Sequence, residues 1–69
     1  MGEKEKEMAN EILAIVSNLD SESEAKEYAR LYLKAQKEAV KVSGEEYNFD
    51  KVYKLISETD SRFKDRFEE

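Results

Sequence analysis

Apolar residues along this chain recur at steps of three and four positions, and no stretch alternates long enough to predict a strand. Over residues 3–19 these residues fall on one face of a helix that we expect to end between Asn18 and Asp20. The members of that face are Met8, Ile12, Ile15, Val16 and Leu19. The pattern predicts an all-α fold whose first helix is amphipathic.

A second helix is bounded by two local signals. Ser21 and Glu24 form a capping box, in which each side chain satisfies a free backbone N–H at a helix start. Gly44 marks the end, because glycine readily takes the left-handed conformation that follows many helices. The predicted core face between them consists of Ala25, Tyr28, Tyr32, Ala35, Ala39 and Val42. Leu31 on one side, and Ala29, Leu33 and Val40 on the other, widen the apolar arc.

The third helix can be capped by Ser43 or by Asn48, and we expect it to start near Glu46. Its apolar residues share an arc of about 100° only if the helix continues through residues 57–61. These residues are Phe49, Val52, Tyr53, Ile56, Phe63 and Phe67. Short connections make each helix antiparallel to the one before, so residues 1–69 are predicted to form a single domain, an up-down-up three-helix bundle. A kink or a short fourth helix near residues 57–61 is the alternative.

A continuous third helix places Asp60 near the centre of the apolar stripe, where an unpaired carboxylate is costly. We therefore expect Asp60 to accept a hydrogen bond from Tyr28 or Tyr32, with Arg30 as an additional charge partner. In the alternative, the helix ends locally and Thr59 or Asp60 caps a short last helix.

Two surfaces of the predicted bundle are candidates for binding. A basic ridge runs along the second helix opposite its predicted core face, through Lys26, Arg30, Lys34, Lys37 and Lys41. It could meet an acidic partner, although glutamates spaced for ion pairs favour an ordinary solvated face. A candidate apolar interaction surface comprises Leu13, Leu33, Val40 and Leu55, unless packing of three helices buries these residues.

Composition narrows the chemistry further. The chain has no cysteine and no histidine, so a thiolate nucleophile, the commonest general base and the usual zinc ligands are missing. We expect no catalytic, cofactor-binding or metal-binding residue and no small-molecule substrate. A net charge of -5 disfavours nucleic acid, and no apolar run is long enough for a membrane span, so a cytoplasmic location is expected. Abundant lysine and glutamate without proline are typical of hyperthermophile proteins and of thermostable designs.

Two functional hypotheses follow. The first is a non-enzymatic helical module that acts through a protein partner or by self-association. The second is a de novo designed three-helix bundle with no natural biochemical function, a reading favoured by the agreement of caps and charge pairs with the predicted helices. The polar run from Ser57 to Ser61 favours a natural origin, because a designer would seldom place it in a core-facing helix.

Overall fold

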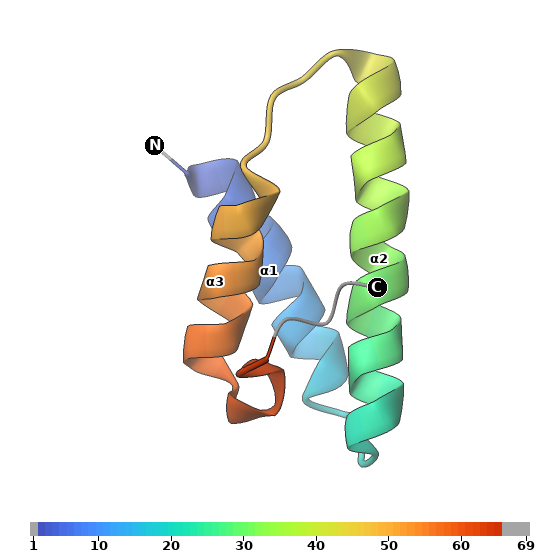
Figure 1. The fold of residues 1–69 in the computed structure, drawn as a ribbon, viewed down its shortest axis with the longest axis vertical. Helices are drawn as coiled ribbons and strands as arrows, with labels where there is room; N and C mark the ends of the chain where they lie inside the picture. The colour runs from blue at the N-terminus through green and yellow to red at the C-terminus, as the bar shows by residue number, and fades with distance from the viewer. Residues whose placement is uncertain (1, 66–69) are drawn as a thin grey trace.

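A computed structural model describes residues 2–65 as three α-helices followed by one 3₁₀ turn. The elements are α1 (Glu3–Val16), α2 (Glu22–Ser43), α3 (Phe49–Thr59) and the turn η1 (Ser61–Phe63). Each helix runs antiparallel to the one before, so α1 and α3 point the same way (Figure 1). The prediction of an all-α three-helix bundle is confirmed. The predicted core position Phe67 lies outside the described residues.

The ends of α2 follow the chemistry of their residues. The Ser21 side chain accepts a hydrogen bond from the Glu24 backbone N–H at 3.3 Å. Gly44 closes the helix at φ 78°, a conformation that glycine adopts without steric penalty. The helix α3 starts at Phe49 rather than near Glu46, because Asn48 is the cap that forms. Its side chain accepts from the Lys51 N–H at 3.2 Å.

The expectation that α3 continues through residues 57–61 is wrong. The helix ends at Thr59, and Asp60 takes an extended conformation with φ -127° and ψ 117°. The Asp60 carboxylate then accepts from the Arg62 backbone N–H at 2.9 Å and caps η1. Ending the helix here loses little packing, because the turn still places Phe63 in the core with 0% of its surface exposed. The alternative of a helix end with a short final element is therefore the one that the structure adopts.

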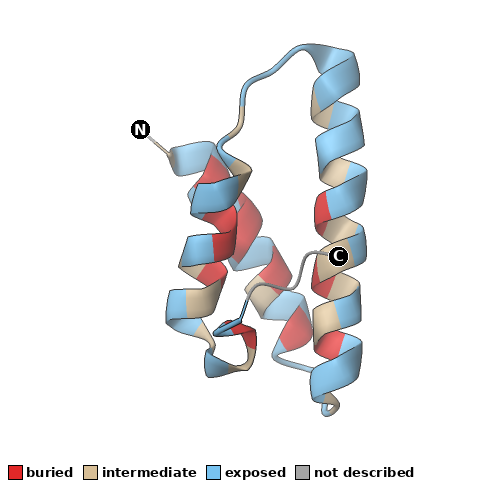
Figure 2. Ribbon diagram, in the orientation of Figure 1, coloured by how far each residue is buried: buried red, intermediate tan, exposed pale blue. Residues whose placement is uncertain are grey.

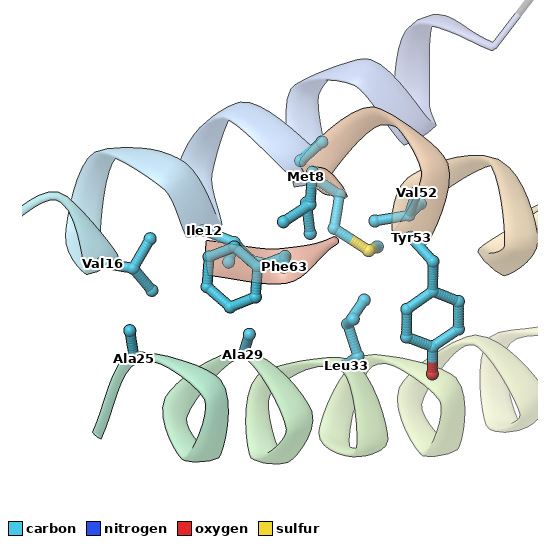
Figure 3. Close-up of a cluster of buried hydrophobic side chains, with 11 residues drawn as sticks. Met8, Ile12, Val16, Ala25, Ala29, Leu33, Val52, Tyr53 and Phe63 are labelled. Carbon is cyan, nitrogen blue, oxygen red and sulfur yellow. The ribbon is translucent and has the colours of Figure 1, made fainter. Parts of the chain in front are cut away.

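The core lies between the three helices and is closed from below by η1. In Figure 3 the Phe63 ring lies between Ile12 of α1 and Ala29 of α2. Ala25 and Ala29 are both 0% exposed, and their small side chains leave room for that ring. The buried apolar residues are Met8, Ala9, Ile12, Val16, Ala25, Ala29, Leu33, Val52, Tyr53, Ile56 and Phe63.

The core face of α2 is rotated by roughly 90° from the predicted one, at about 100° per residue. It follows Ala25, Ala29 and Leu33, whereas Tyr28 and Tyr32 are only half-buried. The remaining predicted core positions, Ala35, Ala39 and Val42, are exposed, as is Ile15 of α1. The physical reason is that Phe63 packs against the alanine side of α2, while a tyrosine tolerates a half-wet position through its hydroxyl.

The longest helix runs the full length of the molecule. With 22 residues, α2 is about 33 Å long, and the largest dimension of the molecule is 35 Å. The pair α1 and α3 packs most closely, while α2 packs against α1 and η1. The last turns of α2 are therefore exposed on most sides, as the pale blue ribbon in Figure 2 shows. Among the described residues, no helix combines the length and the apolar character needed to cross a bilayer.

Candidate interaction surfaces

The four residues predicted to form an apolar interaction surface do not form an exposed patch. Leu33 is 1% exposed and belongs to the core, so its assignment to a surface is wrong. Leu13 and Leu55 are half-buried and pack against the core, and Val40 is half-buried as well. The rotation of α2 explains the correction for Leu33, because it turns the side of the helix that carries Leu33 toward the core.

A different apolar row is exposed on α2, and we call it the outer stripe. It consists of Tyr28, Leu31, Ala35, Ala39 and Val42, which are three or four residues apart and share an arc of about 80°. Val42 is 88% exposed, Leu31 is 50% exposed, both alanines are exposed and Tyr28 is half-buried. Four of these five residues belong to the predicted core face. The helical spacing of these apolar residues was therefore recognised correctly, but the face that they form lies on the surface and not in the core.

The outer stripe is bordered on the α1 side by a fixed tyrosine. Tyr32 Oη donates a hydrogen bond to Glu11 Oε2 at 2.5 Å. This bond, with a smaller contribution from burial, raises the pKa of Tyr32 to about 12. The Tyr28 and Tyr32 rings lie with their centroids 5.9 Å apart. Tyr32 is thus anchored to α1, and the Tyr28 ring lies beside it.

A small hollow lies next to Tyr32 between α1, α2 and the loop before α3. Its volume is about 270 Å³. The lining is mostly polar and consists of Lys4, Glu7, Met8, Glu11, Tyr32, Gln36 and Tyr47. Lys4 closes one side by an ion pair with Glu45, at 3.1 Å between Nζ and Oε2. Part of the polar lining is thus already paired, since Glu11 accepts from Tyr32 and Lys4 binds Glu45.

The basic ridge does not lie opposite the core as predicted, because the rotation of α2 brings it to the side facing α3. Lys37 Nζ donates to Tyr53 Oη at 3.1 Å and lies 5.7 Å from the centre of the Phe49 ring. Lys26 is 3.7 Å from Glu22, and Arg30 is half-buried. Lys34 and Lys41 are exposed. The ridge is therefore not one continuous free surface, and part of it holds α2 to α3.

The predicted contact of Asp60 with Tyr28 or Tyr32 is wrong. Asp60 Oδ2 instead accepts from Arg62 Nη2 at 2.7 Å, an ion pair that lowers the pKa of Asp60 below its ordinary value of 3.8. The contact fails because α3 ends before Asp60, which turns the carboxylate toward the next residues of its own turn. Arg62 also takes the place that was expected for Arg30.

Arg62 is a residue that sequence reasoning missed. Its guanidinium donates from Nη1 to the carbonyl of Leu19 and from Nη2 to the carbonyl of Val16, each at 3.1 Å. These carbonyls stand at and just beyond the C-terminal end of α1, whose last turn contains no basic residue. The sequence contained one signal of this contact. The last turn of α1 has no basic residue that could bond its terminal carbonyls, so a donor from elsewhere in the chain could be expected.

Glu5 is a second residue that sequence reasoning missed. Only 8% of Glu5 is exposed, and its Oε2 accepts from the Asn48 backbone N–H at 2.8 Å. This bond is the chief cause that lowers the pKa of Glu5 below 4.5. A carboxylate at this point stabilises the start of α3, where N–H groups lack partners. Both missed residues join helices and are structural.

The chain matches no family model, no curated protein and no solved structure. Within residues 2–65 there is no group of three or more acidic, cysteine or histidine side chains placed to hold a metal ion. A function therefore has to be argued from the surface that the fold presents.

Proposed function

We propose that this chain is a non-enzymatic helical module that acts by contact with another protein chain, or with a second copy of itself, along the outer stripe. The observation that carries the proposal is the exposure of Leu31 and Val42, at 50% and 88%, in one row on a well-capped helix. Large apolar side chains gathered in a row on the surface are typical of interaction sites.

The geometry at the border of the stripe supports the same proposal. Tyrosines are enriched among residues that dominate binding energy, since a rigid ring offers much contact area and a polar tip. The hydrogen bond from Tyr32 to Glu11 fixes one such ring before any partner arrives. A surface whose aromatic groups are already ordered loses less conformational entropy on binding.

The second candidate is a designed bundle with no natural partner. It is favoured by the agreement between local signals and structure at Ser21, Gly44 and Asn48, where each cap residue does what its chemistry predicts. The two candidates differ in one respect. A bundle designed only for a stable fold should make no specific contact with another molecule at Val42, whereas an interaction module should.

Site-specific photocrosslinking tests the proposal. A photoreactive benzoylphenylalanine replaces Val42 in the full chain, and in a matched control it replaces Glu58, which is exposed on α3. We expect irradiation of cells that produce the protein to give a discrete crosslinked species from position 42 and none from position 58. Equal or absent crosslinking at both positions contradicts the proposal and supports the bundle without a partner.

A further inference from the structure

We infer that the outer stripe is a self-association surface on which a second copy of this chain packs, α2 against α2, antiparallel and centred on Ala35. The inference rests on the proposed function and names its partner. Tyr28, Ala35 and Val42 recur every seven residues, the spacing that keeps one row of side chains facing a neighbouring helix. A two-fold axis at Ala35 makes this row self-complementary.

The sizes of the side chains fit this register. When Ala35 faces Ala35 of the second copy, Tyr28 faces Val42, and Leu31 lies level with Ala39 of the second copy. A large side chain thus meets a smaller one in each of these layers, and the central alanines let the two helices approach closely. A parallel pairing would place Tyr28 against Tyr28 and leave the alanine layers loose.

The charges favour the antiparallel register as well. Lys34 and Glu38 are both exposed and lie on the side of the outer stripe away from α1. In the antiparallel pair, Glu38 of one copy and Lys34 of the other lie on the same side of the contact, about 3 Å apart along the helix axis, so opposite charges come close twice. A parallel pair would place Lys34 and Glu38 of the two copies on opposite sides of the contact, so this charge pair would not form, and it would align the two helix dipoles unfavourably.

The contact is small, which sets the range of concentration in which it forms. The row from Tyr28 to Val42 is about 21 Å long, so two such rows bury less than the roughly 1,200 Å² of a standard specific interface. We therefore expect a weak dimer that becomes visible at roughly 0.1 to 1 mM. Its detection requires a concentration series.

Sedimentation equilibrium of the full chain and of the Ala35→Glu variant tests the association. Ala35 is exposed in the single chain, so this substitution should leave the melting temperature of a dilute sample unchanged. At the two-fold axis it places two carboxylates face to face, and we expect the dissociation constant to rise at least about tenfold. Glu58→Gln on α3 is the matched control and should not change it.

Disulfide trapping tests the register, since the chain contains no cysteine of its own. In a glutathione redox buffer, Ala35→Cys should pair with itself, and a mixture of Tyr28→Cys with Val42→Cys should give the mixed dimer. Val42→Cys alone should not pair, because the two sulfurs would be about 21 Å apart along the helices while a disulfide needs Cα atoms within about 7 Å.

The possible failures are distinguishable. Self-pairing of Val42→Cys would overturn the antiparallel inference in favour of a parallel dimer, and the proposed interaction function would stand. A chain that stays monomeric to about 1 mM would overturn the second copy as partner. The proposed function then fails too if position 42 gives no photocrosslink, and it stands if position 42 crosslinks to a different protein.

Discussion

At the scale of single residues, two charged side chains join helix ends, in addition to the contacts that Tyr32 and Tyr53 make between helices. Glu5 joins the start of α1 to the start of α3, and Arg62 joins the turn η1 to the end of α1. Each satisfies backbone groups that a helix end leaves without partners. The Asp60 carboxylate accepts from Nε and Nη2 of Arg62, while Nη1 and Nη2 also donate to the carbonyls of Leu19 and Val16 at the end of α1.

The contact between Asp60 and Arg62 gives a prediction that depends on pH. The pKa of Asp60 is lowered in the folded chain, so the ion pair contributes stability above the ordinary value of 3.8 and loses it as the pH falls below that value. We expect Arg62→Met to lower the melting temperature by about 5 to 10 °C near neutral pH. The difference between the two chains should shrink at about pH 2, when Asp60 is protonated.

Thermal unfolding followed by circular dichroism at the two pH values measures this effect. Lys64→Met is the matched control, because Lys64 is an exposed cation in the same segment. It should change the melting temperature little at either pH. A difference for Arg62→Met that stays constant with pH would show that Arg62 acts through its hydrogen bonds to the Leu19 and Val16 carbonyls and through packing, and not through the ion pair with Asp60.

At the scale of helices, the rotation of α2 decides which residues are core and which are surface. We expect Leu33→Ala to lower the free energy of unfolding by about 2 to 5 kcal/mol, since Leu33 is 1% exposed. Leu31→Ala removes the same atoms from a side chain that is 50% exposed and should change stability by less than about 1 kcal/mol. Urea unfolding at low protein concentration measures both values.

The two leucines serve as controls for each other, because they are two positions apart on one helix and have the same helical propensity. A larger loss for Leu31→Ala than for Leu33→Ala would mean that α2 packs with the face predicted from the sequence, because Leu31 lies nearer the centre of that face. The orientation found here would then be wrong.

The limits of sequence reasoning follow from the range of the interactions involved. The caps at Ser21 and Gly44 depend on a side chain and the backbone next to it, so residue chemistry predicts them. The orientation of α2 depends on Phe63, which arrives from another part of the chain and packs beside Ala29 (Figure 3). Helical spacing fits the row through Tyr28 and Tyr32 as well as the row through Ala29 and Leu33, so periodicity alone could not choose between these two faces.

The ending of α3 was missed for a related reason. The phase of Phe63 agrees with a continuous helix, yet the ring reaches the core through a 3₁₀ turn instead. The polar run before it gains a cap at Asp60 and an ion pair with Arg62 by leaving the helix. Agreement in phase is weak evidence for continuity when both conformations bury the same ring.

At the scale of the whole molecule, the two ends of α2 differ in how closely they are packed. The lower part of α2 packs against α1 and η1, and the residues from Lys37 to Ser43 are all exposed except Val40, which is half-buried. Local unfolding starts where buried contacts are few. We therefore expect the end of α2 to open before the rest of that helix.

Hydrogen exchange measured by NMR tests this unevenness. In a dilute sample we expect the amides of residues 38–43 to exchange at least about tenfold faster than those of residues 29–33, because the former can open without disturbing the core. If a second copy packs on the outer stripe, protection of residues 38–43 should rise with protein concentration in the parent chain and not in Ala35→Glu. Even protection along all of α2 at low concentration would contradict the uneven bundle, since it would require the exposed end to open only with the whole fold.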